Sequence, residues 1–125
     1  MYHQQRWTIE KIRSRLQTIE PKIYQKSTAL DRFWYKELES PIKKPDLHPD
    51  LATYTEIKPN AYWGNWQTNF LLYTLFQIPK EWGNQQPVLL YLPLGIAGDF
   101  SHPETLAYVD GLPYGAIDRH HQEFF

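Results

Sequence analysis

Apolar side chains in the first part of the chain recur at helical spacing. They follow one another at steps of three and four residues, which places them on one face of a helix: Ile9, Ile12, Leu16 and Ile19. The pattern predicts a helix over residues 6–20, with Thr8 as its N-cap. Pro21 ends this helix or starts a new turn, because its ring removes a backbone donor and clashes with the preceding turn. The narrow apolar face favours docking on a protein core over binding at a membrane surface.

The next part of the chain reads as an arm followed by a connector. Residues 27–39 mix helical spacing with strand-forming aromatics, and we expect an extended or mixed arm that lays Leu30 and Trp34 on the core. Residues 40–53 hold three prolines within ten positions, which exclude a regular helix or a central strand. We therefore expect residues 1–39 to pack as helix and arm on a β-sandwich formed by residues 40–125.

Short apolar runs separated by turn residues follow to the end of the chain. Residues 68–78 are apolar on both faces of a strand, which predicts a central strand covered on both sides or an inner strand with a contact to another domain. Asp110-Gly111 lies between apolar alternating residues and is a strong signal for a hairpin turn. The pattern predicts one mainly β domain with an N-terminal α-helix. The other predicted strands are residues 54–58, 87–94, 105–109, 114–117 and 121–125.

Composition removes several functional classes. The formal net charge of −1 offers no general attraction to nucleic acid. The chain has no cysteine, which excludes disulfides, a thiolate nucleophile and thiolate metal ligands, and suits a reducing compartment. Its apolar runs are far shorter than the ~20 residues of a membrane helix, and its first seven residues lack the apolar region of a signal peptide. We therefore expect a cytoplasmic protein without a membrane partner.

The aromatic content of 16% suits either a strand-rich core or a surface that stacks on sugars. Trp63 and Trp66 flank the turn signal Gly64-Asn65, and they are the candidates for such a carbohydrate-binding platform. The more common alternative is that one or both rings cover the end of the sandwich. The sequence does not state which face either ring occupies.

A cluster of polar residues near the end of the chain is a candidate metal site, and it consists of Asp118, His120, His121 and Glu123. On a strand, neighbouring side chains point to opposite faces, so Asp118 converges with His120, or His121 converges with Glu123. Two ligands do not complete a zinc site, so we predict no metal site and no cofactor in this chain. A small metalloenzyme that uses Asp118, His121 and Glu123 is the weaker alternative. No nucleophile elbow or phosphate-binding loop supplies another chemistry.

Two linked motifs occupy the last part of the chain. Residues 104–113 read E-T-L-A-Y-V-D-G-L-P, and residues 115–123 read G-A-I-D-R-H-H-Q-E. Upstream, a strand that ends in Ile78-Pro79 is followed by Trp82, and the helix with Arg15-Leu16 precedes a Leu-Asp-x-x-Trp arm at residues 30–34. This layout resembles the N-terminal domain of α-mannosidases of glycoside hydrolase family 38, in the branch with cytosolic, vacuolar and bacterial members. The second motif departs from the family pattern by one extra residue before Asp118.

The resemblance implies a β-sandwich of jelly-roll, galactose-binding-like type at the front of a larger enzyme, of which this chain is a piece. It implies that the zinc-dependent catalytic domain follows this chain. No catalytic residue of the family therefore corresponds to a position in this chain. The implied role of this chain is to pack on the catalytic domain, to shape the entrance of that domain or to form an oligomer contact. The implied substrate of the parent enzyme is a terminal α-mannoside. A stand-alone carbohydrate-binding module is the alternative. The family-signature residues are Glu104, Tyr108, Asp110, Gly111, Asp118, Arg119, His120, His121 and Glu123.

Overall fold

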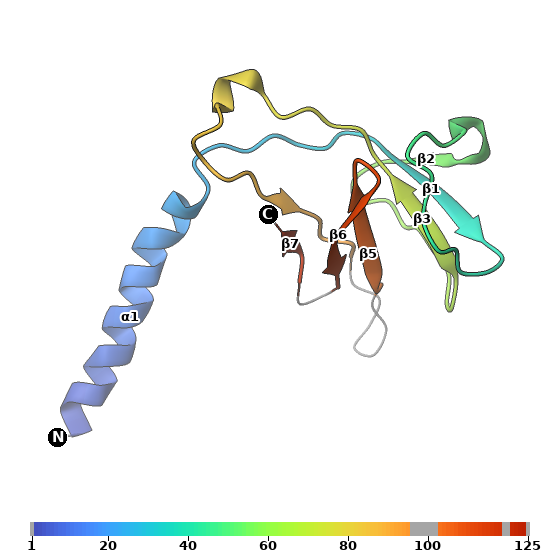
Figure 1. Ribbon diagram of the computed structural model, residues 1–125. Coiled ribbons are helices and arrows are strands. Elements are labelled where there is room, and N and C mark those ends of the chain that lie inside the picture. The colour runs from blue at the N-terminus through green and yellow to red at the C-terminus, as the bar shows by residue number, and fades with distance from the viewer. Residues whose placement is uncertain (1, 96–102, 119–120, 125) are drawn as a thin grey trace. The chain divides into compact units, whose positions relative to one another are not determined.

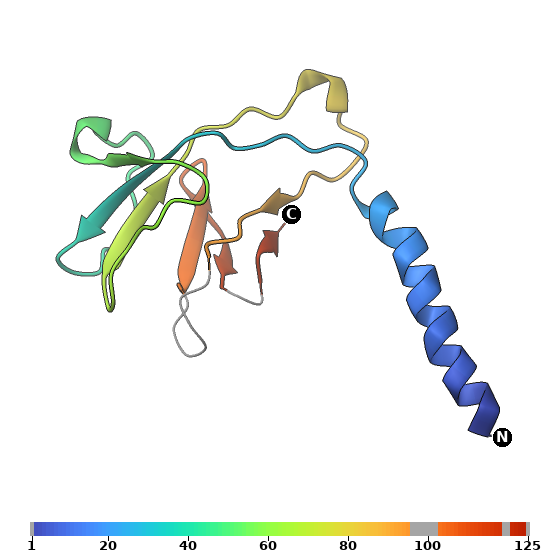
Figure 2. The same ribbon diagram turned by 180° about the vertical axis from the view of Figure 1, so that it is seen from behind.

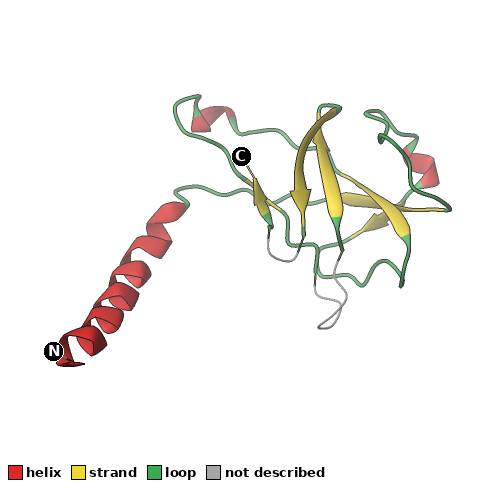
Figure 3. Ribbon diagram, turned by 60° about the horizontal axis from the view of Figure 1, so that its bottom comes forward, coloured by secondary structure: helices red, strands yellow, loops and turns green. Residues whose placement is uncertain are grey.

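The computed structural model describes residues 2–95, 103–118 and 121–124, which form one α-helix, seven β-strands and two short 3-10 helices. The segments that follow the long helix are mainly strands and loops (Figure 3). Each pairing between the described strands is antiparallel. The chain divides into two compact units, Met1–Leu30 and Asp31–Phe125. The first unit holds the helix, and the second holds all the strands.

Helix α1 spans Tyr2–Ile23 (Figure 1). It begins before Thr8, so the prediction of Thr8 as the N-cap is wrong. Pro21 lies inside the helix, and α1 ends two residues beyond it. A proline at this position removes a single backbone hydrogen bond in the last turn, where the helix is about to end in any case. The predicted helix is therefore confirmed and is longer at both ends.

Strand β1 (Phe33–Leu38) is the centre of a three-stranded sheet, between β2 (Thr55–Ile57) and β3 (Asn69–Tyr73) (Figures 1 and 2). The expected arm is thus in part a strand. The prediction that residues 68–78 form a central strand is wrong, because β3 lies at the edge of this sheet and ends at Tyr73. Its apolar side chains are half-buried, and the Tyr73 hydroxyl donates to the Leu47 carbonyl in the connector at 3.4 Å.

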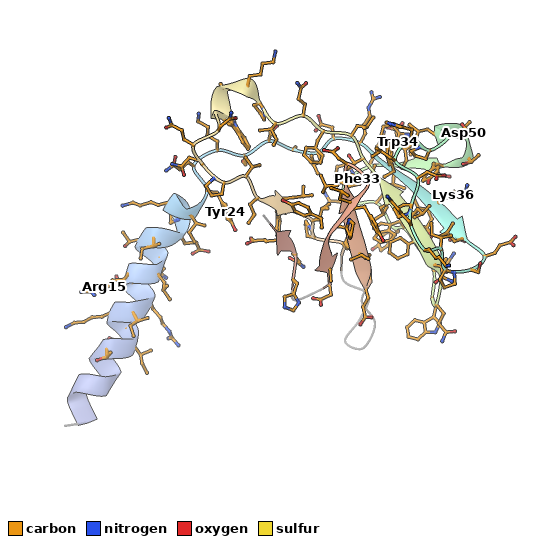
Figure 4. All side chains as sticks on the ribbon, in the orientation of Figure 1. Arg15, Tyr24, Phe33, Trp34, Lys36 and Asp50 are labelled. Carbon is orange, nitrogen blue, oxygen red and sulfur yellow. The ribbon has the colours of Figure 1, made fainter. Side chains whose placement is uncertain are left out.

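The connector at residues 40–53 has the irregular backbone that its prolines predict, apart from the short helix η1 (Leu51–Thr53). The carboxylate of Asp50 accepts a hydrogen bond from the Ala52 amide at 3.1 Å and begins this turn. The Lys36 Nζ atom on β1 donates to the Thr53 hydroxyl at 3.1 Å. Lys36 and Asp50 are labelled in Figure 4. The connector is therefore tied to the central strand.

Strands β5 (Thr105–Val109) and β6 (Leu112–Ile117) form the predicted hairpin. Asp110 and Gly111 both have positive φ, 50° and 77°, as a two-residue type I′ turn requires. The register changes between Ala107 and Tyr108, which places one extra residue, Tyr114, on β6 as a bulge. Strand β6 begins two residues earlier than predicted, directly after the turn.

The predicted strands at residues 87–94 and 121–125 are present as two-residue strands. Strand β4 (Leu90–Tyr91) pairs antiparallel with β7 (Glu123–Phe124). The Leu92 amide extends this pairing by donating to the Gln122 carbonyl at 2.8 Å. The predicted turn after Pro79 is the short helix η2 (Lys80–Trp82).

The protein is a mixed α/β chain, mostly strand, in which one helix precedes small antiparallel sheets. Within the described parts of the chain, the apolar side chain that is buried is Ile117, at 3% exposure at the end of β6. The described strands form three separate sheets and do not close into a sandwich. Across the same residues, no helix has the length and apolar content that a membrane span requires.

Candidate functional site

The segment between β2 and β3 holds the most exposed aromatic rings of the strand unit, and we call residues 60–67 the aromatic loop. Three of its residues have positive φ: Asn60 at 62°, Gly64 at 78° and Gln67 at 54°. Glycine adopts this region without strain, whereas side-chain-bearing residues persist there only when their surroundings hold them. The loop therefore has a defined shape that its contacts maintain.

Trp63 is the first anchor of the aromatic loop. Its ring centroid lies 5.0 Å from that of Phe70 on β3, in an edge-to-face arrangement, and 5.7 Å from that of Tyr35 on β1. Tyr35 and Phe70 are themselves 6.2 Å apart. Tilted and edge-to-face pairs at these distances are the favourable geometries for aromatic rings. Trp63 thus completes a three-ring cluster on one face of the sheet.

Asn65 is the second anchor. Its side-chain amide donates to Glu37 Oε1 at 3.0 Å, and the Tyr35 hydroxyl donates to the same oxygen at 2.9 Å. Burial, and then the hydrogen bond and negative charge of Glu37, raise the pKa of Tyr35 to about 12. In the described part of the chain, the second carboxylate oxygen of Glu37 has no hydrogen-bond donor. It remains an available acceptor beside the loop.

The two anchors leave two other rings of the loop exposed. Trp66 is 73% exposed and Tyr62 is fully exposed. The structure therefore separates the predicted pair: Trp63 packs in the ring cluster, and Trp66 lies on the surface. Tyr62 was missed, because the prediction considered only the two Trp residues that flank Gly64-Asn65. Flat exposed rings of this kind can stack on the C–H faces of sugars.

The signature residues of the β5–β6 hairpin have structural contacts. The Tyr108 hydroxyl donates to the Lys43 carbonyl in the connector at 3.4 Å. Asp110 and Gly111 form the turn, and a Cβ built on Gly111 would lie 3.8 Å from Leu47 Cδ2, also in the connector. The tip of the hairpin therefore meets the connector. Glu104 lies just before β5 and is exposed.

Two described residues of the polar cluster after β6, Asp118 and His121, lie outside the strands and bond to each other. Asp118 Oδ1 accepts from the His121 backbone amide at 2.8 Å, and both carboxylate oxygens lie 3.0 Å from His121 Nδ1. The Asp118 amide donates to the His121 carbonyl at 3.1 Å. The predicted last strand starts too early at His121, because β7 begins only at Glu123. An Asp side chain that bonds to a nearby backbone amide competes with strand pairing. Arg119 and His120 lie outside the described residues.

Asp118 and His121 together offer two possible metal ligands, a carboxylate and an imidazole. Their side chains are 29% and 74% exposed, respectively. A search of the described residues finds no group of three His, Asp or Glu side chains arranged to hold a metal ion. The contact is an ion pair only when His121 is protonated. Within the described residues, this contact connects the residue after β6 with one that lies two positions before β7.

Comparisons with protein-family models, with curated proteins and with solved structures find no match to this chain.

Proposed function

We propose that this chain is the non-catalytic N-terminal accessory domain of an α-mannosidase of glycoside hydrolase family 38. The observation that carries the proposal is the pair of linked motifs at residues 104–123, which resemble the family's N-terminal domain over two consecutive elements. The chain order of a helix followed by antiparallel strands is compatible with that domain. Under this proposal the sheets belong to a jelly-roll sandwich, and the parent enzyme is cytoplasmic.

The contacts of the signature residues support a structural role for them. Asp110 and Gly111 form a hairpin turn, Tyr108 bonds to the connector, and Asp118 bonds to His121. Hydrolysis of a glycoside requires two carboxyl groups that flank the glycosidic bond of the substrate. The contacts described for these signature residues do not form such a pair. The Asp and His ligands of zinc and the Asp nucleophile would belong to the downstream catalytic domain, which this accessory domain would contact.

The test compares the 125-residue chain with the product of the complete open reading frame that contains it. Both are purified and assayed for hydrolysis of 4-nitrophenyl α-mannoside and for bound zinc by mass spectrometry. We expect hydrolysis and zinc in the complete product and neither in the 125-residue chain. Turnover by the 125-residue chain, or an open reading frame without a further domain, would overturn the proposal.

A second candidate function is a carbohydrate-binding module that acts on its own. The observation that favours it is the anchored aromatic loop, which presents Tyr62 and Trp66 to solvent. Titration of mannose and mannobiose up to millimolar concentrations, followed by Trp fluorescence, tests it directly. A saturable change supports the candidate, and an unchanged spectrum with every sugar removes it.

A further inference from the structure

We propose that the aromatic loop is a carbohydrate-stacking site in which Tyr62 and Trp66 contact the sugar, whereas Trp63 holds the loop in place. This proposal rests on the second candidate function and replaces the predicted Trp63–Trp66 pair. The Trp63 ring is half-buried and packs against the rings of Tyr35 and Phe70, so it is less available to a ligand than an exposed ring. Tyr62 and Trp66 belong to the same loop and are the rings that solvent reaches.

The charge around the loop indicates a neutral ligand. Residues 59–79 contain no charged side chain, and the polar side chains of the loop are the amides of Asn60, Asn65 and Gln67. The neighbouring Glu37 carboxylate accepts one hydrogen bond from the loop, from Asn65, and repels anions. Apolar ring faces with amides and a carboxylate suit a ligand that has C–H faces and many hydroxyl donors. A saccharide combines these two properties.

The lack of basic residues in the loop and the nearby Glu37 carboxylate argue against a lipid surface as the ligand. Exposed aromatic residues also occur where proteins insert into a bilayer interface, but surface binding is normally reinforced by Lys and Arg near the inserted rings. The aromatic loop has no basic residue, and Glu37 opposes an anionic headgroup. We therefore commit to a saccharide and treat vesicle binding as a contrary outcome of the test.

The anchors lower the cost of binding. A loop that is already ordered does not lose conformational freedom when its ligand arrives. Trp63, Asn65 and the left-handed residues of the loop set its shape through contacts with the sheet. A loop held in an uncommon backbone conformation is a frequent feature of functional sites. The strained positions Asn60 and Gln67 lie at the two ends of this loop.

The experiment is native affinity electrophoresis of the full 125-residue chain in gels that contain α-mannan, xylan, cellulose derivatives or β-glucan. Calorimetric titration with the polysaccharide that retards the protein then measures the affinity. We expect Trp66→Ala and Tyr62→Ala each to weaken binding at least tenfold. Trp63→Phe, which preserves a ring at the anchor, retains binding. Leu75→Ala is the matched control, since Leu75 is 70% exposed and lies outside the loop.

The outcomes distinguish a failure of this proposal from a failure of the second candidate function, on which it rests. If the wild-type chain binds a polysaccharide and both Trp66→Ala and Tyr62→Ala bind equally well, the loop assignment is overturned while the carbohydrate-binding function stands. If the wild-type chain binds no polysaccharide, the assignment and the second candidate function both fail, and the accessory-domain proposal is unaffected. Sedimentation with phosphatidylcholine vesicles that is lost in Trp66→Ala, without polysaccharide binding, would assign the loop to a membrane surface instead.

Discussion

Alternate residues of β1 join the sheet to two different segments of the chain. Tyr35 and Glu37 lie on the face that holds the aromatic loop through the contacts of Trp63 and Asn65. Lys36 lies on the opposite face, where it bonds to Thr53 in the connector. Successive side chains of a strand point to opposite faces, so one short strand can organise both segments. Burial raises the pKa of Tyr35, and the Glu37 carboxylate, which accepts hydrogen bonds from Tyr35 and Asn65, raises it further.

The raised pKa of Tyr35 predicts a loss of stability at alkaline pH. Its folded pKa of about 12 lies above the ordinary value of 10.0, so the neutral hydroxyl is favoured in the folded state. This contribution is fully present below about pH 10 and is lost as the pH rises through about 12, because the unfolded chain releases the proton first. Urea unfolding at pH 9 and pH 11 should show a steeper loss in the wild type than in Tyr35→Phe. Tyr62→Phe is the exposed control, and identical pH dependence of wild type and Tyr35→Phe would contradict the prediction.

Gly111 makes the hairpin turn sensitive to substitution through its backbone. A Cβ at this position would meet Leu47 and Lys44 at ordinary contact distances, so space is not limiting, but its φ of 77° is unfavourable for alanine. We expect Gly111→Ala to destabilise the protein by about 1 kcal/mol, and Gly111→Asn by less, since asparagine tolerates left-handed conformations. Thermal unfolding of the two variants measures the difference. Equal losses would show that the turn does not require a left-handed residue.

The elements are held together by short loops with specific contacts rather than by broad apolar faces. The aromatic loop shows this best, since a single ring and a single amide attach it to β1 and β3. The hairpin meets the connector in a similar way, through Tyr108 and the Gly111 turn. An element attached by few contacts loses its position when one of them is removed.

Truncation of the two tryptophans in the aromatic loop should have unequal effects on stability. Trp63→Ala removes two aromatic pairs, and we expect it to lower the free energy of unfolding by about 2 kcal/mol, since each pair contributes roughly 0.5–1.5 kcal/mol beyond area burial. Trp66→Ala removes an exposed ring, and we expect a change within about 0.5 kcal/mol. Chemical denaturation of both variants makes the comparison. A larger loss for Trp66→Ala would mean that the roles of anchor and exposed ring are reversed.

For the whole molecule, charge is small and unevenly distributed. The formal net charge is −1 and the sequence pI is about 6.5, so repulsion between molecules is weak near neutral pH. The uncharged residues 59–79 include β3, an edge strand, and exposed edge strands without charged residues are sites of association. The β2 edge is shorter and carries Glu56. Association should therefore involve the β3 side.

A single lysine beside β3 should reduce self-association more than the same lysine on β2. Leu75 is 70% exposed and follows β3, whereas Thr55 is an exposed residue of β2. We expect Leu75→Lys to lower light scattering at pH 6.5 severalfold relative to the wild type, and Thr55→Lys, with the same added charge, to have a smaller effect. Equal effects of the two variants would attribute the association to net charge alone.

The local sequence pattern was sufficient to predict the helix, the irregular backbone of the proline-rich connector and the hairpin turn. Steps of three and four residues predict α1, the prolines predict an irregular connector, and Asp110-Gly111 predicts a turn with two left-handed residues. Each of these depends on neighbours within a few positions. The errors at the same scale are at boundaries. Thr8 is not the N-cap, and the last strand begins at Glu123 rather than at His121.

Only the tertiary structure decided the order of the strands and the roles of the aromatic residues. The double-sided apolar pattern of residues 68–78 predicted a central strand, but the sheet places β1 in the centre and β3 at the edge. Trp63 and Trp66 are equivalent in the sequence, three residues apart around a turn, yet one packs against Tyr35 and Phe70 and the other is exposed. These outcomes depend on contacts between residues about 30 positions apart, such as Glu37 with Asn65. A local pattern carries no information about which distant partner a side chain will meet, and that choice determined the candidate site.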